Sequence, residues 1–454
     1  MKVTLDVENT TVTRDGKLHL DPFEPTNSLT MVGILTDQGH EQHFPFDHEE
    51  HISGHDYSDR VQWFLDNATV LIMHNAAHDL LWLWESGFTY DGPVFDTMLA
   101  EYVLQRGQKE PLSLEMCANR YELETKKQDT LKEYFRKGVT TRDIPIDELT
   151  EYLSADLHAT QQLADKLYYR INTVPDAGLL ETVILTNKVA VALSRIYQRG
   201  FAVDLDALEE VRSEFETEKK KLVLDLQKHI TKIMGDTPVN LNSPEQLSQV
   251  IYSRKPHDKT MWQNNFDPYM GKDKYKNTVK HNSSLVYKTK AKQCSNCYGN
   301  GKYYKTKKDG TKWAKASNCT ECKGIGYKFI ETTELAGLRF SAPDAKWISA
   351  HGFTTSKGNL EILEGFARQK GMDDAMRFLH KVKRLSALDT YLSSFVDGIK
   401  TFTKTDGKLH VRLLQHRTAT GRLSGADPNM QNMPRGGTFP VKKVFVSRFD
   451  GGKI

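Results

Sequence analysis

Long hydrophobic runs are missing from this sequence of 454 residues. No stretch approaches the ~18 consecutive apolar residues that a membrane-spanning helix requires, so we expect no transmembrane helix and no membrane partner. The opening residues, MKVTLDVENT, also lack the basic segment and the apolar run of a secretory signal peptide. We therefore expect a cytoplasmic protein.

Cysteine is scarce, with 5 residues in the chain. Their arrangement is not that of a secreted disulfide framework. Cys117 stands alone, and the others form two Cys-x-x-Cys pairs separated by 21 residues: Cys294, Cys297, Cys319 and Cys322. Each pair continues as Cys-x-Gly-x-Gly, and the glycines permit a tight turn. Because four such thiolates suit tetrahedral Zn²⁺, we predict a structural zinc site with four cysteine ligands. Unliganded cysteines are the alternative.

A strong excess of one charge is absent from the chain as a whole, whose net charge is +3. Positive charge is nevertheless concentrated, because Ser253–Lys315 holds 16 Lys or Arg against 4 Asp or Glu. Aromatic residues lie among these cations: Trp262, Tyr269, Tyr275, Tyr287, Tyr303, Tyr304 and Trp313. Cations and aromatic rings together suit nucleic acid, through phosphate pairing and base stacking. A solvated Lys-rich loop is the alternative.

The first 175 residues have the pattern of an α/β domain. Strands are predicted at Val3–Val7, where apolar and polar residues alternate, at Leu29–Thr36 and at Thr69–Met73. Helices are predicted from Asp79 to Trp84 and from about Asp147 to Tyr169, where apolar residues recur at helical spacing.

Helical patterns dominate the next part of the chain. One predicted helix ends near Gly200, a suitable C-terminal cap. Asp206 and Glu209 form a capping-box pair that opens a long amphipathic helix, which ends at Gly235. We expect these helices and the next one to project as an antiparallel arm.

That next helix has a clear start signal. Ser243 is predicted as its N-cap, with Pro244 at the first helical position and Gln246 completing the capping box. Helical character returns from Leu360 to about Lys400, after the Lys-rich and Cys-containing stretch.

Several acidic side chains from three predicted elements could meet at one point. Asp6 and Glu8 are two residues apart on a strand, so both lie on one face. Tyr152 and Asp156 are four residues apart on a helix and also share a face. Asp79 lies in the helix that follows the third strand. The pattern predicts a cluster of carboxylates beside a phenol.

Such a cluster suits phosphodiester hydrolysis with two metal ions. Mg²⁺ or Mn²⁺ prefers oxygen ligands. One ion would lower the pKa of the attacking water, and the other would stabilise the leaving 3′-oxygen. A phenol beside the water can orient it. We predict Asp6, Glu8, Asp79 and Asp156 as ligands of two ions, with Tyr152 assisting.

The order and spacing of these motifs resemble those of the DEDDy proofreading exonucleases, which have a ribonuclease H-like fold. Asp-x-Glu comes first, Asn75-x-x-x-Asp79 follows about 70 residues later, and Tyr-x-x-x-Asp lies on the closing helix. Phe95–Ala100 and Ser113–Tyr121 also look like segments of that family. The resemblance implies a 3′–5′ exonuclease in which Asn75 contacts nucleic acid.

A second resemblance rests on Thr418–Pro434, with the sequence TATGRLSGADPNMQNMP. This run is similar to the Thr-x-x-Gly-Arg-Leu-Ser … Pro-Asn-Leu-Gln-Asn signature of family A DNA polymerases, the DNA polymerase I class. Leu385–Gly398 looks like the family's segment between thumb and palm, and Asn240–Pro244 resembles a thumb motif. Arginine charge suits phosphate, and amides suit groove edges. We predict further DNA contacts from Arg384, Arg417, Arg422, Asn429, Gln431 and Asn432.

One departure from the family affects the expected activity. The first catalytic aspartate of the palm would follow shortly after Val444–Val446 and Gly452–Ile454, and the sequence stops there. We therefore expect one chain of a split or interrupted, phage-type polymerase, located in the host cytoplasm, that cannot extend a primer alone. The expected partners are DNA primer–template, single-stranded 3′ ends, a second polypeptide with palm and fingers, and a processivity factor at the Lys-rich insert.

The expected fold is an α/β ribonuclease H-like exonuclease domain followed by a mostly α-helical thumb with a zinc-knuckle insert. The boundaries are residues 1–175 for the exonuclease domain, 176–252 for the thumb helices, 253–335 for the insert, and 336–454 for the rest of the thumb and the start of the palm. Two other functions stay open: a non-catalytic DNA-binding subunit, and an RNA exonuclease like ribonuclease D.

Overall fold

The structure is a computed structural model that describes residues 1–14, 17–51, 56–123, 129–173, 178–256, 270–272, 278–280, 283–308, 310–311, 315–341, 347–349, 352–433, 440–449 and 451–452. Its contacts divide the chain into two units, each described by itself. Unit 1 contains Met1–Val211 and Ser394–Ile454, and unit 2 contains Arg212–Ser393. Within the described ranges, no helix has the length and apolar character needed to cross a membrane.

Unit 1 is built on a mixed five-stranded sheet in the order β5-β4-β1-β6-β7. The strands are β1 (Lys2–Asn9), β4 (Leu29–Thr36), β5 (Glu41–Pro45), β6 (Val70–Met73) and β7 (Val94–Asp96). β1 lies antiparallel to β4 and parallel to β6. Every residue of β4 is buried, as expected for a strand covered on both faces. β1, β4 and β6 confirm the three predicted strands.

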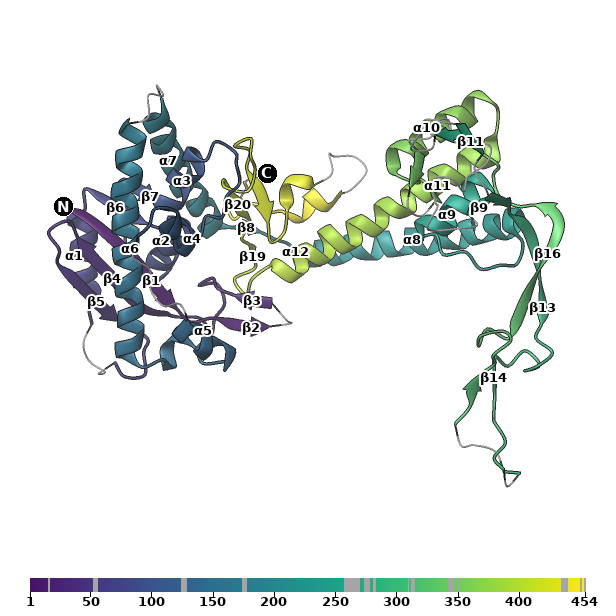
Figure 1. The fold of residues 1–454 in the computed structure, drawn as a ribbon, viewed down its shortest axis with the longest axis horizontal. Helices are drawn as coiled ribbons and strands as arrows, with labels where there is room; N and C mark the ends of the chain where they lie inside the picture. Colours follow the sequence, from purple (N-terminus) through teal and green to yellow (C-terminus); the bar gives the residue numbers. More distant parts are fainter. Residues whose placement is uncertain are drawn as a thin grey trace. The chain divides into compact units, whose positions relative to one another are not determined.

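Helices pack against this sheet and against one another (Figure 1). They are α1 (Ser58–Asn67), α2 (Ala76–Glu85), α3 (Thr97–Leu104), α4 (Leu114–Arg120), α5 (Asp129–Arg136), α6 (Ile146–Thr173) and α7 (Leu179–Arg199). α6 confirms the predicted long helix and contacts β1 and β4. A Cβ atom at Gly33 of β4 would lie 2.8 Å from Leu153 Cγ and 2.9 Å from Leu157 Cδ1. Glycine therefore permits the close approach of α6 to the sheet.

The chain after residue 393 also belongs to unit 1. Its elements are α12 (Asp397–Phe402), β19 (Lys408–Leu409), β20 (Arg412–Leu414) and β21 (Ser424–Ala426), and β19 pairs with β8 (Phe201–Ala202). The His410 ring stacks on Phe23 with ring centroids 3.5 Å apart. The remaining strands of unit 1 form a hairpin of β2 (Val12–Arg14) and β3 (Lys17–His19).

α7 differs from its expected assignment. It packs on α2, α3 and β7, and the contacts place it in unit 1. The boundary expected between residues 175 and 176 therefore falls inside this unit. α7 is amphipathic, and its buried residues face α2, α3 and β7. Helical periodicity shows which face of a helix is buried but not which elements cover that face.

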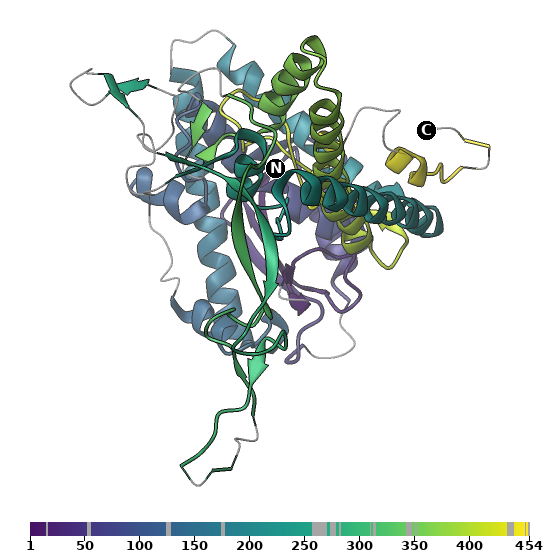
Figure 2. The ribbon, with the colours of Figure 1, turned by 90° about the vertical axis from the view of Figure 1, so that its right-hand side faces the viewer.

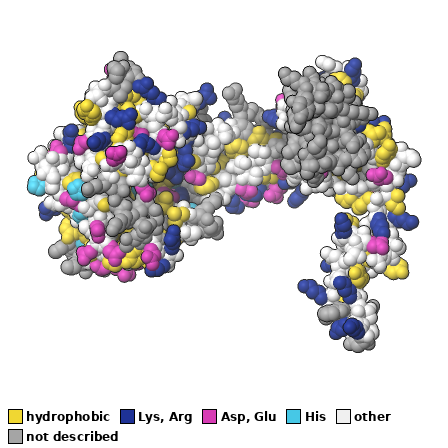
Figure 3. Space-filling model, viewed as in Figure 1, with side chains coloured by type: hydrophobic (Ala, Val, Ile, Leu, Met, Phe, Trp, Pro, Cys, Tyr) yellow, Lys and Arg dark blue, Asp and Glu magenta, His cyan; other side chains and the backbone are white. Residues whose placement is uncertain are grey.

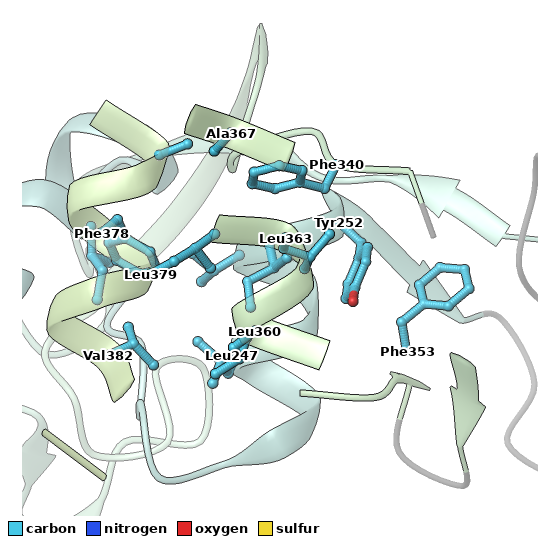
Figure 4. Close-up of a cluster of buried hydrophobic side chains, with 14 of the residues drawn as sticks. Leu247, Tyr252, Phe340, Phe353, Leu360, Leu363, Ala367, Phe378, Leu379 and Val382 are labelled. Atoms are coloured by element: carbon cyan, nitrogen blue, oxygen red, sulfur yellow. The ribbon is translucent and has the colours of Figure 1, made fainter. Parts of the chain in front are cut away.

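Helices also make the core of unit 2 (Figure 4). They are α8 (Leu205–Met234), which begins in unit 1, α9 (Pro244–Tyr252), α10 (Lys357–Gln369) and α11 (Asp373–Thr390). Tyr252 and Phe378 are its largest fully buried side chains. Ion pairs join Lys219 to Asp389 at 2.7 Å and Lys381 to Asp225 at 3.0 Å. Since the numbers rise along α8 as they fall along α11, these two helices are antiparallel. The expected arm thus has α11 as the partner of α8.

The helix starts in this region differ from two predictions. Asp204, not Asp206, caps α8, because its Oδ1 accepts a hydrogen bond from the Ala207 N–H at 2.9 Å. Ser243 caps α9 as predicted, accepting from the Gln246 N–H. The Gln246 side chain accepts from the Asn240 N–H at 2.7 Å instead of closing a capping box.

The Cys-containing insert forms a two-stranded ribbon in unit 2. β13 (Tyr287–Gln293) pairs antiparallel with β16 (Tyr327–Leu335), and β14 (Lys302–Tyr303) pairs with β15 (Ser317–Asn318) beyond it. The ribbon extends away from the helices of unit 2 (Figures 1 and 2). Shorter pairs complete the unit: β9 (Arg254–Pro256) with β12 (Ser283–Leu285), β10 (Met270–Lys272) with β11 (Thr278–Lys280), and β17 (Ile348–Ser349) with β18 (Gly352–Phe353). Trp262, Tyr269, Tyr275 and Trp313 lie outside the described residues.

Candidate active site

Strand β1 presents the first two predicted acids. Val3, Leu5 and Val7 are buried in the core, while Asp6 and Glu8 are only half buried. This alternation follows from the two-residue period of a strand. Asp6 and Glu8 therefore lie together on the face that α6 reaches, as the sequence predicts.

Helix α6 brings the third acid to the same place. Carboxylate oxygens of Asp6, Glu8 and Asp156 all lie within 4.8 Å of one another. Tyr152 lies one turn earlier on α6, close enough for Asp156, Glu8 and Asp6 to influence its hydroxyl. Burial and these carboxylates raise the pKa of Tyr152 well above its usual value. Its hydroxyl stays protonated at neutral pH and can donate a hydrogen bond.

The fourth acid, Asp79, lies deeper than the other three. Its side chain is buried at 2% exposure, and Oδ2 has no hydrogen-bond partner among the described residues. Burial raises its pKa well above the ordinary value, and the negative charges of Asp6, Asp96 and Glu8 raise it further. A backbone hydrogen bond from Val7 acts in the opposite direction. Asp79 is thus close to Asp6 and Glu8 but outside the tight group of three carboxylates.

These features fit a divalent cation. Three carboxylates this close repel one another, and a buried carboxylate with an orphaned oxygen is costly unless a positive charge compensates it. Oxygen-only donors suit Mg²⁺ or Mn²⁺. The residues able to hold such ions are Asp6, Glu8, Asp79 and Asp156.

Asp96 is a structural residue of the site that the sequence analysis did not single out. Its carboxylate accepts hydrogen bonds from the N–H groups of Met98 and Leu99 at the start of α3. It also accepts from the N–H groups of Asn75 and Ala76 at the start of α2, at 3.2 and 2.9 Å. One buried acid therefore caps two helices and fixes where α2 carries Asp79. An aspartate immediately before a helical pattern was the available signal.

Asn75 occupies an unusual backbone position. Its φ of 71° places it in the left-handed region, which asparagine tolerates better than most residues. A cavity of about 620 Å³ lies beside it in unit 1. Asn75 and His78 line this cavity together with Arg412 and His416, from the polymerase-like part of the chain. The cavity therefore joins the start of α2 to the segment that precedes Thr418–Pro434.

The polymerase-like run is held by its own side chains. The Gly425 N–H donates to Gln431 Oε1 at 2.8 Å, and the Gln431 N–H donates to Asn429 Oδ1 at 3.2 Å. The hydroxyl of Tyr102 on α3 donates to the Thr418 carbonyl at 2.7 Å. The carbonyl groups of Asn429 and Gln431 thus stabilise this loop.

The remaining predicted DNA contacts differ in their surroundings. Arg417, Arg422 and Asn432 are exposed in unit 1. Arg384 lies in unit 2, where its guanidinium donates to both carboxylate oxygens of Glu218, at 2.6 and 2.7 Å. That bidentate pair joins α11 to α8. The structure therefore shows a structural contact for Arg384, and its expected contact with DNA stays a prediction.

The four cysteines of the two Cys-x-x-Cys pairs come together in unit 2. All four are buried and unoxidised, with Sγ–Sγ distances of 3.8 Å for Cys294–Cys319 and 3.6 Å for Cys297–Cys322. A disulfide would need about 2.05 Å. A tetrahedral ion with metal–sulfur bonds of ~2.3 Å gives sulfur–sulfur edges of about 3.8 Å. The cluster therefore has the spacing of a tetrahedral thiolate site.

Backbone groups support this cluster. The Gly301 N–H donates to Cys297 Sγ and the Gly326 N–H donates to Cys322 Sγ, both at 3.2 Å. Backbone hydrogen bonds, chiefly from Cys322, lower the pKa of the Cys319 thiol to about 6. Such bonds favour the thiolate, which is the form that binds a metal.

Two family models match this chain, one over its exonuclease-like part and one over its polymerase-like part. Residues 37–172 match the family model described as 3′-5′ exonuclease, and residues 333–453 match that of DNA polymerase family A. The first range includes Asp79, Tyr152 and Asp156 but begins after Asp6 and Glu8. The geometry nevertheless places Asp6 and Glu8 beside Asp156, as the sequence predicts.

Relatives cover most of this chain but extend well beyond it. DNA polymerase I of Bacillus subtilis is 22% identical over 77% of this chain and 28% of the relative. The DNA polymerase of Bacillus phage SP01 is 24% identical over 95% of this chain and 43% of the relative. The chain thus spans less than half the length of these two proteins.

A solved structure shares the fold. It is the POL domain of Pol1 from M. smegmatis in complex with DNA primer-template and dNTP, at 18% identity and a TM-score of 0.57. The match covers 98% of this chain and 55% of the other. Both family models are matched in their expected order, so the chain is similar to family A DNA polymerases and to their 3′-5′ exonuclease domain.

Proposed function

We propose that this chain removes nucleotides from the 3′ end of DNA by metal-dependent hydrolysis and holds primer–template beside that site. The observation that carries the proposal is the convergence of Asp6, Glu8 and Asp156 from two separate elements, next to the buried Asp79. The 3′-5′ exonuclease match supports the type of reaction.

Divalent ions, when bound, would supply a nucleophilic water and stabilise the leaving 3′-oxygen. Asp6 and Glu8 of β1 and Asp156 of α6 would hold these ions. Tyr152 keeps its proton and can orient the water by a hydrogen bond. Asp96 keeps α2 in position, so that Asp79 remains close to Asp6 and Glu8.

The test uses single-stranded DNA and RNA oligonucleotides of one sequence, labelled at the 5′ end, with Mg²⁺. We expect the full chain to shorten the DNA from its 3′ end, and Asp6→Ala to lower the rate by at least ~100-fold. An exposed carboxylate, Asp66 of α1, gives the matched control Asp66→Ala, which should keep native activity. Degradation of RNA alone would favour an enzyme like ribonuclease D. No degradation, with primer–template still bound, would favour a non-catalytic subunit.

We also propose that the four clustered cysteines hold a structural Zn²⁺. Metal analysis of the purified chain should find about one zinc per chain. A folded protein without zinc would contradict this assignment.

The second polypeptide and the processivity factor stay predictions. The comparisons do not test either one.

A further inference from the structure

The β13–β16 ribbon, together with the segment between its two strands, carries an excess of positive charge. Between Tyr287 and Leu335 the described residues include ten lysines, against the three acids Glu321, Glu331 and Glu334. Two of these acids are already paired, Glu334 with Lys288 and Glu321 with Lys328. Dark-blue Lys and Arg side chains recur along the ribbon in Figure 3. The described acids of Tyr287–Leu335 are therefore too few to neutralise its lysines.

Three of these lysines share one face. In the register of the ribbon, Lys290 lies opposite Ile330, and Lys292 lies opposite Lys328. Directly opposed residues lie on the same side of an antiparallel pair, and so do residues two apart on a strand. All four residues are exposed. We call Lys290, Lys292 and Lys328 the lysine face.

The lysines of this face differ in their partners. Lys328 is paired with Glu321, whereas no ion pair joins Lys290 or Lys292 to an acid among the described residues. The ribbon is also largely open to solvent. Lys290 and Lys292 are therefore the cations of the lysine face that are available to a polyanion.

The turns beside the cysteines add two side chains to the ribbon. Tyr298 and Lys323 each follow the second cysteine of a pair, and we call them the knuckle tips. Both have left-handed backbones, with φ of 49° and 53°. Glycine would adopt this conformation without strain, whereas a tyrosine or lysine there is uncommon. Tyr298 is 78% exposed, so an aromatic ring and a cation are held out to solvent.

The ribbon is attached firmly to the helical part of unit 2. The Asp236 N–H donates to the Thr289 carbonyl at 2.9 Å, and the Ala291 N–H donates to Asp236 Oδ2 at 2.8 Å. Gly235 ends α8 against this strand, where a Cβ atom would lie 2.2 Å from the Thr289 oxygen. The base of the ribbon is therefore held by backbone contacts at the end of α8.

We propose that the lysine face and the knuckle tips bind the phosphodiester backbone of duplex DNA, at a site separate from the exonuclease carboxylates. Regularly spaced ammonium groups match a polyanion with regularly spaced charges. An exposed tyrosine among cations is a common feature of nucleic-acid surfaces. The choice of DNA as the polyanion rests on the proposed function. An acidic protein partner is the competing occupant.

The test measures binding of the full chain to a fluorescent DNA duplex at several salt concentrations, in an Asp6→Ala background that leaves the probe intact. The test variant is Lys290→Gln/Lys292→Gln/Lys323→Gln. The matched control removes three exposed lysines from helices α7 and α10 and the turn after α10, as Lys188→Gln/Lys357→Gln/Lys370→Gln. Zinc content should be equal in both, which shows that the knuckles remain folded.

We expect the test variant to bind the duplex about tenfold more weakly than the control. The slope of log affinity against log salt should fall by about 2 to 3, because each lost phosphate contact removes about 0.9. Tyr298→Ser should weaken binding with little change in slope. Equal affinity and slope in the test and control variants would overturn the proposal and favour an acidic protein as the partner of the lysine face.

A separate assay distinguishes this inference from the proposed function. The same lysine variants with Asp6 restored should degrade a short single-stranded oligonucleotide at the native rate. Loss of duplex binding with native exonuclease activity supports the ribbon site. Native duplex binding by a chain without exonuclease activity contradicts the proposed function and leaves the ribbon site intact.

Discussion

At the scale of single residues, the site combines acids with different roles. Asp6, Glu8 and Asp156 converge at its surface, whereas Asp79 is buried with an orphaned oxygen and a raised pKa. Asp96 has a structural role, because it caps two helices. Substitutions of Tyr152 and Asp96 can distinguish a residue that takes part in hydrolysis from one that holds the site in position.

Tyr152→Phe removes only the hydroxyl that can orient the attacking water. Since Tyr152 stays protonated and lies near Asp156 and Glu8, we expect kcat for exonuclease to fall by about 100-fold, with little change in oligonucleotide KM. The rate of release of labelled nucleotide measures this. Tyr168→Phe is the control, because Tyr168 is an exposed tyrosine on the same helix. Equal rates for the two variants would remove Tyr152 from the mechanism.

Asp96→Asn tests positioning. Asparagine keeps one oxygen, so some of the four backbone N–H groups that Asp96 satisfies would lose their partner in a buried place. We expect a loss of about 1 to 3 kcal/mol in the free energy of unfolding, measured in urea. Exonuclease activity should fall in parallel, because α2 carries Asp79. Asp56→Asn, at an exposed helix start, should cost less. A stable variant without activity would instead indicate a direct chemical role.

At the scale of elements, the cysteine turns depend on glycine. A Cβ atom at Gly301 would lie 2.1 Å from the Gly324 carbonyl oxygen, and one at Gly326 would lie 2.3 Å from that of Gly299. The two turns therefore pack backbone against backbone. The start of α8 also depends on a local hydrogen bond, because Asp204 caps this helix in place of the predicted Asp206.

Gly301→Ala should therefore weaken the proposed zinc site. We expect a chelator to remove zinc from this variant at least ~10-fold faster than from the native chain. Gly310→Ala is the matched control, since Gly310 also has a left-handed backbone but has no atom within 4 Å of the place where a Cβ would lie. Its zinc should leave at nearly the native rate. Similar rates for the two variants would show that backbone packing does not support the site.

At the scale of the whole molecule, titratable groups inside unit 1 link its stability to pH. His74 and His78 are half buried by surface exposure, and desolvation lowers the pKa of each from 6.5 to about 4. Both stay neutral in the folded unit and protonate on unfolding below pH 6.5. Their contribution to stability is complete above pH 6.5 and is lost as pH falls towards 4. The loss is on the order of 3 kcal/mol for each histidine.

Calorimetry at about pH 7 and about pH 4.5 can test this. The raised pKa values of Asp96 and Asp79 act in the opposite direction, because these carboxyls bind protons in the folded unit as pH falls. The test therefore compares the native chain with His74→Asn at both pH values. This variant should lose less stability in unit 1 than the native chain between the two pH values, because asparagine does not titrate. An acid shift of unit 1 that is unchanged in this variant would contradict the role assigned to His74.

Local patterns were enough to predict several parts of this protein. The alternation in β1 predicted that Asp6 and Glu8 share a face, and helical spacing predicted that Tyr152 and Asp156 do so on α6. The paired Cys-x-x-Cys spacing predicted the cysteine cluster. These results depend on fixed strand and helix periods, or on neighbours in the chain.

Other features depend on contacts between distant segments, which periodicity does not encode. Tertiary packing placed α7 and the segment after residue 393 in unit 1, and paired Arg384 with Glu218. It also buried Asp79 and brought the starts of α2 and α3 together, so that both donate hydrogen bonds to Asp96. The sequence by itself determined which side chains could share a face and bind a metal. Only the tertiary structure decided which faces meet, because burial and charge interactions arise when distant elements pack together.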